Sequence, residues 1–442
     1  MSARKRLRRF ATVSALLVAL VVLTFLGYVK YQQHDSYQTL IPKTTTALVR
    51  VDVYALYRCM LGETFGTKKK SGKNRLKGIA IPANIFCYTV AGKQPGTWFT
   101  SLPISSFEQW EKSLRETLYL VQKHKQPGIH FAASKDSRWT IAYDKTNIAM
   151  AYSTGKEPVE DQLQKILQHR DMVAVSKSVF HSISNQDGHI TFVSGKASGS
   201  IVFETGSVIA QATCDATGFV MPGEVRHQQG DNKTALNFWL FGNFENVLQG
   251  KTFTIDTFHF YGDSLLATQP KGLELTVTEP QIQRDSIVSY EYNDDFEKVA
   301  TATVKEQTVP GLNLRLYADA TSLNALLQHD HIVVADSQLV NRSLFPLYQL
   351  HVSSFAEGMQ FSTVKQPAVP ATVNSKDFVG LAINFDLLRV QEPFSYVRTY
   401  LEPFRVLTMS GSVKAGAQVS IEARLDFKDA SRSSLAQLLD FL

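Results

Sequence analysis

The stretch Phe10-Ala-Thr-Val-Ser-Ala-Leu-Leu-Val-Ala-Leu-Val-Val-Leu-Thr-Phe-Leu-Gly-Tyr-Val29 contains no charged residue. A helix of about 20 apolar residues is long enough to cross the roughly 30 Å hydrocarbon core of a bilayer. Five basic residues precede the stretch, and basic residues beside a span favour the cytoplasmic side of the membrane. The sequence therefore predicts a transmembrane signal-anchor at residues 10–29, with residues 1–9 as a cytoplasmic basic tail.

A cleavable signal peptide is the alternative for this N-terminus. Its apolar region is usually about 7 to 15 residues long and is followed by a small-x-small cleavage site. The apolar run here is longer, and Gly27-Tyr-Val-Lys-Tyr-Gln32 contains no such site. We therefore expect an uncleaved single-pass protein that contacts the lipid bilayer through residues 10–29. Residues 30–46 would form a polar stalk, and residues 31–442 would be extracytoplasmic.

The net charge of +6 comes entirely from the N-terminus. Residues 1–30 hold six Lys or Arg and no acid, which leaves 46 − 6 = 40 basic against 40 acidic residues in the remainder. Proteins that bind nucleic acid carry a basic surface on the folded domain. A neutral remainder therefore argues against nucleic acid as a partner.

The chain after residue 30 is too long for one ordinary core and suggests two or three domains. Helical spacing of apolar residues after Ser105, and again after Pro158, predicts helices among short strands. From His189 onward, β-like segments with glycines dominate. We predict an α+β fold rich in antiparallel sheet, with short helices packed on the sheets. Residues 47–185 would form an α+β domain, and residues 186–442 a β-rich α+β domain.

The C-terminal stretch has the clearest pattern. Between Ala417 and Lys428, apolar and polar residues alternate strictly, which is typical of an antiparallel strand covered on one face. The residues Leu435, Leu438, Leu439 and Leu442 then recur at helical spacing. We expect a final helix that packs this leucine stripe on the sheet.

Known catalytic motifs are missing from the sequence. Gly250-Lys-Thr252 resembles the end of a phosphate-binding loop, but Glu245 stands where that loop needs glycine. Gly195-Lys-Ala-Ser-Gly199 places its serine one position too late for a nucleophile elbow. No catalytic residue and no cofactor-binding residue is predicted.

Two groups of residues could bind metal or form a disulfide. His329 and His331 would point to the same side of a strand, with His351 as a third ligand, but their turn-like position favours solvent-exposed histidines. We predict no metal site. Cys59 and Cys87 are the more plausible disulfide pair among three cysteines, and three unpaired thiols are the alternative.

The segment Ile41-Pro-Lys-Thr-Thr-Thr-Ala-Leu-Val-Arg-Val-Asp52, after a basic N-terminus and an apolar stretch, resembles a family of uncharacterised membrane-anchored bacterial envelope proteins. Their exported part opens with an "IPK-x-x-x-x-V-x-x-x-D"-like strand, and residues 378–442 are similar to their C-terminal part. This resemblance implies a bacterial inner-membrane protein. It implies no catalytic residues.

Three functions follow as hypotheses. The first is a non-catalytic, membrane-anchored envelope protein that presents an interaction or scaffold surface to a protein partner. The second is binding or shielding of a lipid or another amphiphile, because strands such as residues 417–427 can line an apolar groove. The third is a hydrolase with an unrecognised site. An apolar groove would favour the second hypothesis, and converging carboxylates or histidines the third.

Overall fold

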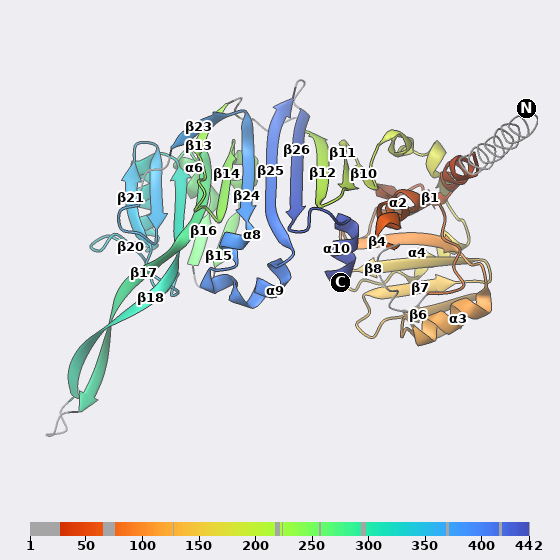
Figure 1. Ribbon diagram of the computed structural model, residues 1–442, viewed down its shortest axis with the longest axis horizontal. Coiled ribbons are helices and arrows are strands. Elements are labelled where there is room, and N and C mark those ends of the chain that lie inside the picture. The colour runs from red at the N-terminus through yellow and green to blue at the C-terminus, as the bar shows by residue number, and fades with distance from the viewer. Residues whose placement is uncertain are drawn as a thin grey trace, which may run out of the picture. The chain divides into compact units, whose positions relative to one another are not determined.

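A computed structural model describes residues 27–64, 76–126, 128–216, 222, 224–255, 258–292, 298–367, 371–414 and 418–441 (Figure 1). The chain forms two compact units, residues 1–204 with 438–442 and residues 205–437. The sequence places the boundary near residue 185. Residues up to 204 belong to the first unit, in which β10 (Ile190–Ser194) pairs with β2 (Thr45–Asp52), and β11 (Ala197–Phe203) pairs with β10.

The predicted transmembrane helix is not found. Among the described residues, no helix combines the length and the apolar character needed to cross a bilayer. This finding contradicts the predicted fold with an N-terminal transmembrane helix, and with it the signal-anchor and the single-pass inner-membrane localisation. Residues 10–26 of the predicted span, and the basic tail before them, lie outside the described residues, whereas residues 27–36 are helical.

The stretch predicted as a polar stalk is folded. After the helical residues 27–36, β1 (Leu40–Pro42) pairs antiparallel with β9 (Met172–Ala174). Ile41 is buried in the main core of the first unit, and Tyr37 packs against that core. The stretch resembles a stalk in sequence because its few apolar residues stand among many polar ones.

One antiparallel sheet organises the first unit, in the strand order β5–β6–β7–β8–β4–β3–β2–β10–β11. Its remaining strands are β3 (Asn84–Val90), β4 (Thr97–Pro103), β5 (Val121–Gln126), β6 (Ile129–Ala133), β7 (Trp139–Tyr143) and β8 (Asn147–Ser153). Its helices are α2 (Val53–Thr64), α3 (Phe107–Glu116), α4 (Glu160–Leu167) and the 3-10 turns η1 (Val175–Lys177) and η2 (His181–Asn185).

Helices α3 and α4 cover opposite faces of this sheet. Trp110 and Leu114 of α3 pack in one cluster with Ala132, whereas Leu163 of α4 packs in the other cluster with Phe131. Neighbouring residues of a strand point to opposite faces, so β6 is buried on both. Helix α3 ends earlier than the apolar spacing suggests, because Val121 already begins β5 and is exposed.

The strands of the other unit also pair antiparallel, in the order β12–β26–β25–β24–β14–β17–β18–β22–β21–β20–β19. These strands are β12 (Ser207–Asp215), β14 (Leu236–Phe241), β17 (Gly272–Tyr292), β18 (Lys298–Tyr317), β19 (Val333–Val334), β20 (Leu339–Val340), β21 (His351–Phe355), β22 (Gly358–Ser362), β24 (Asp377–Asn384), β25 (Phe404–Lys414) and β26 (Gln418–Phe427).

Smaller elements surround this sheet. Two separate strand pairs are β13 (Val225–Gln228) with β23 (Thr372–Ser375), and β15 (Thr252–Ile255) with β16 (Phe258–Tyr261). The helices are α5 (Glu245–Leu248), α6 (Gly262–Ala267), α7 (Ala320–His329), α8 (Phe385–Leu388), η3 (Glu392–Val397) and α9 (Arg398–Leu401). The last helix is α10 (Ser434–Phe441), which begins in this unit and whose residues from Leu438 onward belong to the first unit.

The strands β17 and β18 continue far beyond their neighbours. Strand β14 pairs with β17 only up to Val277, and β22 pairs with β18 only from Asn313 onward. Beyond a register shift between Thr278 and Gln281, the two long strands pair with each other out to Tyr292 and Lys298. Figure 1 shows this ribbon extending past the other strands of its sheet.

The last helix, α10, is packed differently from the leucine-stripe prediction. Ala436 is buried, whereas the side chain of Leu439 is 53% exposed. Gln437 is buried and donates to the carbonyl oxygens of Asp429 and Arg432. The helix therefore rests partly on a polar contact with the loop before it. Leu442 lies outside the described residues.

Candidate functional site

A cavity of the second unit measures about 850 Å³ and lies where four neighbouring strands end. Residues Phe241, Gly272, Tyr317 and Gly358 occupy one row across β14, β17, β18 and β22. Residues just outside that row complete the lining, such as Lys271 and Glu357. The antiparallel register therefore brings together segments from distant parts of the chain.

A glycine in this row lets two aromatic rings meet. The rings of Phe241 and Tyr317 have centroids 5.0 Å apart, with Gly272 on the strand between them. A Cβ atom on Gly272 would lie 2.3 Å from Cδ1 of Phe241. The absence of a side chain at residue 272 thus allows a continuous aromatic wall.

Behind the aromatic wall lies a buried carboxylate. Glu274 is 1% exposed and accepts hydrogen bonds from the Tyr317 hydroxyl at 2.9 Å and from the Gln228 backbone N–H at 2.8 Å. Burial raises the pKa of Glu274, and the two hydrogen bonds and Arg315 oppose that shift. Glu274 therefore ties together β17, β18 and β13.

A buried cation stands beside this carboxylate. Arg315 is 8% exposed, and its Nε donates to Oε1 of Gln360 at 3.1 Å. With the amide oxygen of Gln228 turned toward it, Arg315 also donates from Nη1 and Nε at 2.6 and 2.8 Å. Its guanidinium lies 4.7 Å from the ring centroid of Phe355. These contacts satisfy a charge that would otherwise be costly to bury.

Strand β13 packs on the polar network of Glu274 and Arg315. The His227 ring stacks on Trp239 with centroids 3.8 Å apart, and Asn237 donates to the carbonyl oxygen of Gln228 at 3.1 Å. Gly380 leaves room for the Trp239 ring, since a Cβ atom there would meet it at 2.0 Å. Strand β13 consequently covers the polar face of the sheet, and the cavity lies beside β13.

The opposite face of the same strands is apolar. Leu273, Leu316 and Met359 lie in one row, and Leu314 packs with Phe361 in the next. Helix α7 covers this face with Leu323 and Leu327. The sheet therefore separates an ordinary apolar core from a polar network that ends at the cavity.

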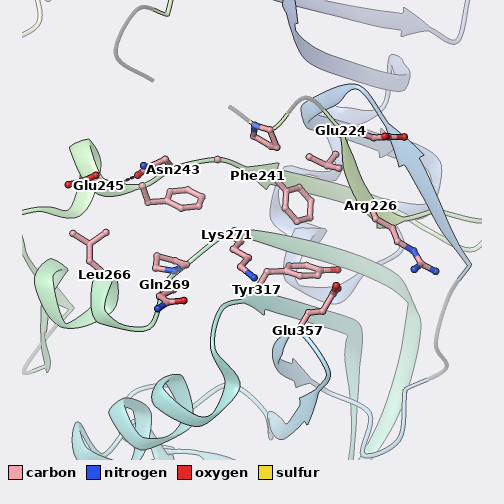
Figure 2. A pocket seen from close by; sticks show the side chains of 15 residues that line it. Glu224, Arg226, Phe241, Asn243, Glu245, Leu266, Gln269, Lys271, Tyr317 and Glu357 are labelled. Carbon is pink, nitrogen blue, oxygen red and sulfur yellow. Dashed lines mark hydrogen bonds between the residues drawn. The ribbon is translucent and has the colours of Figure 1, made fainter. Parts of the chain in front are cut away.

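Apolar and charged side chains share the cavity wall (Figure 2). The apolar part consists of Pro222, Val225, Phe241, Phe244, Leu266, Pro270 and Tyr317. The charged part consists of Glu224, Arg226, Glu245, Lys271 and Glu357. Arg226 is engaged, because its Nε donates to the Thr372 hydroxyl at 2.8 Å.

The hydroxyl of Tyr317 is poorly suited to acid–base chemistry. It already donates to Glu274, and burial together with that carboxylate raises the pKa of Tyr317 above its usual range. A general acid or base works best when its pKa lies near the working pH. The Tyr317 hydroxyl is therefore not a ready proton donor or acceptor near neutral pH.

The histidines considered as metal ligands are dispersed. His329 ends α7 with its side chain 85% exposed, 2.9 Å from the Asp330 carboxylate. His331 follows in the left-handed region, with φ 54°. His351 belongs to β21. Within the part of the chain that the structure describes, no three His, Cys, Asp or Glu side chains are grouped to hold a metal ion.

A thiol–imidazole contact in the first unit escaped the sequence search. Sγ of Cys59 lies 3.3 Å from Nε2 of His189. The other ring nitrogen, Nδ1, accepts from the Phe203 backbone N–H at 2.8 Å, which places the imidazole proton on Nε2. His189 thus presents a proton to the sulfur and cannot accept one from it. Burial also raises the pKa of Cys59 and lowers that of His189, so the pair is not an activated nucleophile.

The three cysteines, Cys59, Cys87 and Cys214, carry free thiols. Cys59 lies on α2, and Cys87 lies on β3 opposite Val49 and Thr100. The disulfide considered between Cys59 and Cys87 is therefore not formed.

The sequence search missed the cavity because its lining is spread over residues 222–357. One local signal was present. Glu274 and Arg315 each stand between leucines, in Leu273-Glu-Leu275 and Leu314-Arg-Leu316. A charge at the centre of an apolar strand is rarely buried without a partner. Two such strands therefore point to a shared buried network.

Comparison with known proteins gives little further information. No family model and no curated protein matches the chain. Crystal forms I, III and IV of TP0453 match it with TM-scores of 0.22, 0.25 and 0.23 and sequence identities of 8%, 7% and 7%. These matches cover 74% to 75% of this chain and 89% to 92% of TP0453. A likeness at this level carries no argument, and the resemblance to envelope proteins stays a prediction.

Proposed function

We propose that this protein is a non-catalytic binding protein whose cavity in the second unit holds a small amphiphilic molecule. The observation that carries the proposal is the composition of the cavity wall. Phe241, Phe244 and Tyr317 offer an apolar surface, and charged side chains such as Lys271 stand beside them. Ligand sites in proteins are typically concave and mostly apolar, with a few polar groups that orient the ligand.

The size of the cavity supports a small molecule. A volume of about 850 Å³ falls within the range of roughly 300 to 1,000 Å³ that is usual for small-molecule sites. The buried network of Glu274 and Arg315 fixes the strand ends that form the wall. The site is thus held by packing and hydrogen bonds before a ligand arrives, which lowers the entropic cost of binding.

Titration of the full chain with the neutral dye N-phenyl-1-naphthylamine tests this function. We expect saturable fluorescence enhancement, and Phe244→Ser should weaken the binding about tenfold because it removes an apolar wall. Phe253→Ser is the matched control, since Phe253 is 40% exposed and lies on β15, away from the lining. Equal binding by both variants would contradict the proposal.

A second candidate function rests on the ribbon of β17 and β18. Between Gln281 and Tyr292, and between Lys298 and Val309, these strands pair only with each other in the described part of the chain. Free strand edges offer backbone groups to another strand. Ile282 and Val304 of the ribbon are 69% and 64% exposed. The ribbon would then present the interaction surface to which a partner protein adds a strand.

Shortening the ribbon tests this second function. Arg284 and Glu306 face each other, so replacing residues 285–305 by Asn-Gly should close a tight hairpin between them. We expect the shortened chain to bind the naphthylamine dye like the parent but to lose proteins that the parent crosslinks. Recovery of the same proteins by both chains would count against the ribbon as an interaction surface.

A further inference from the structure

We propose that the ligand of the cavity carries one anionic group, which pairs with the ammonium group of Lys271, and an apolar body that lies against Phe241 and Tyr317. This inference rests on the proposed binding function and names the chemistry of its ligand. Carboxylates, sulfonates and phosphates share the required charge. The inference concerns Lys271 because its surroundings differ from those of the other charged residues in the wall.

The backbone fixes Lys271 at the centre of the wall. Its N–H donates to the Tyr317 carbonyl oxygen at 2.8 Å, and its own carbonyl oxygen accepts from the Gly242 N–H at 3.0 Å. Residue 271 is therefore held between the ends of β14 and β18, next to both aromatic rings. In Figure 2 the Lys271 side chain extends between Phe241 and Tyr317.

The ammonium group of Lys271 is available to pair with an anion. Among the described residues it forms no ion pair, whereas the other cation of the wall, Arg226, is hydrogen-bonded to Thr372. The Lys271 side chain is exposed, so an anion can reach its ammonium group. A ligand that also lies against Phe241 and Tyr317 would gain from both contacts.

Neutral donors stand on the same side of the wall. Oδ1 of Asn243 already accepts from the Glu245 backbone N–H at 2.7 Å, which leaves its Nδ2 group to donate. The Gln269 amide lies beside Lys271 in Figure 2. Each amide is a further neutral donor of the lining, whereas Lys271 supplies the charge with which an oxyanion would pair.

The acidic residues of the wall are spread along the lining. Figure 2 shows Glu224 and Glu245 at opposite ends of it, with Glu245 beside Asn243, whose Oδ1 accepts from the Glu245 N–H. Glu357 lies near Tyr317 in the same view, on the side away from Gln269. An anion at Lys271 would therefore lie away from the carboxylates at the two ends.

Two dyes with one scaffold test the inference. N-phenyl-1-naphthylamine is neutral, and 8-anilinonaphthalene-1-sulfonate adds a sulfonate to the same rings. In the full chain, Lys271→Met should weaken binding of the sulfonate about tenfold and leave the neutral dye within about twofold. Lys271→Arg should restore the sulfonate affinity. Lys305→Met, which removes an exposed lysine of the ribbon, should change neither affinity.

The outcomes separate this inference from the proposed function. Equal weakening of both dyes by Lys271→Met would show that Lys271 acts through its hydrocarbon stem, and would overturn the anionic ligand while leaving the cavity as a binding site. A sulfonate affinity unchanged in Lys271→Met would overturn it equally. Failure of the parent chain to bind the neutral dye would instead remove the proposed function and the inference with it.

Discussion

The rings of Phe241 and Tyr317 lie 5.0 Å apart, across a strand on which residue 272 has no side chain. The contact depends on that glycine, because a Cβ atom would come within 2.3 Å of the Phe241 ring. Two strands that are not neighbours in the sheet thereby share one aromatic surface. That surface is the apolar wall of the proposed binding site.

Replacing Gly272 by alanine should disturb this wall. The added methyl group must displace the Phe241 ring, and overpacking of this kind costs about 1–3 kcal/mol. We expect a lower melting temperature and weaker binding of the neutral naphthylamine dye. Gly230→Ala is the matched control, because the nearest atom to its Cβ would be Thr234 Cγ2 at 3.4 Å, an ordinary contact. Similar losses in both variants would contradict the role of Gly272.

Removing the carboxylate of Glu274 should destabilise the second unit. Glu274→Ala leaves the Tyr317 hydroxyl and the Gln228 N–H without acceptors, and leaves Arg315 without its negative neighbour. We expect the free energy of unfolding to fall by about 3 kcal/mol. Glu274→Gln keeps the shape and one acceptor, so its loss should be smaller. Urea unfolding of both variants measures the difference, and an equal loss would show that only packing matters at this position.

The raised pKa of Glu274 predicts a pH dependence. A carboxyl group with a raised pKa in the folded state holds its proton more tightly there than in the unfolded chain. Raising the pH above the ordinary value of 4.5 therefore favours the unfolded chain until the folded-state pKa is passed. Relative to Glu274→Gln, the parent should lose stability across this window. Urea titrations between pH 4 and 7 check the sign, and a parent that gains stability relative to the variant would refute the raised pKa.

In the first unit, replacing Arg50 even by lysine should lower the free energy of unfolding. Its guanidinium is 5% exposed and donates to the Tyr37 hydroxyl and to the carbonyl oxygens of Ile183, Gln186 and Gly188. A lysine cannot reach this spread of acceptors, so Arg50→Lys should cost about 3 kcal/mol.

This loss can be measured in a Trp239→Phe background. The remaining tryptophans, Trp98, Trp110 and Trp139, all belong to the first unit, so their fluorescence follows its unfolding. Arg58→Lys on the exposed surface of α2 is the control and should change stability by less than about 0.5 kcal/mol. Indistinguishable midpoints for the two lysine variants would show that the Arg50 hydrogen bonds are dispensable.

The sequence predicted those elements whose pattern is local. The alternation after Ala417 predicted a strand, and β26 forms there from Gln418. Apolar spacing after Pro158 predicted a helix, and α4 buries Leu163 and Ile166. In each case one face of the element contacts an apolar core, so apolar residues recur along the segment with the period of the helix or strand.

The ribbon could not be predicted in this way. As strands, its residues after Gln281 pair only with each other in the described part of the chain, and this pairing joins residues that are distant in the sequence. The stretch from Asp285 to Glu297 is acid-rich, a composition that suggests a linker or an edge. The structure places strand residues up to Tyr292. The strands of the ribbon are defined by the pairing of β17 with β18, and a local sequence pattern does not reveal that pairing.

The candidate site was equally hidden from the sequence. It depends on the register that aligns Phe241, Gly272, Tyr317 and Gly358, and none of these residues is unusual in its own segment. The predicted N-terminal span failed differently. It was inferred from an apolar stretch that lies largely outside the described residues, and no described helix can cross a bilayer.

One face of β17 and β18 is polar and the other is apolar, and this difference disfavours a wrong alignment of the two strands. A slip of one residue between them would turn one of the two strands over, so that either Glu274 or Arg315 would enter the leucine layer under α7. That charge would be buried in hydrocarbon without its partner, at a cost of several kcal/mol. An all-leucine sheet would tolerate such a slip. The buried Glu274 and Arg315 thus favour the alignment on which the cavity depends.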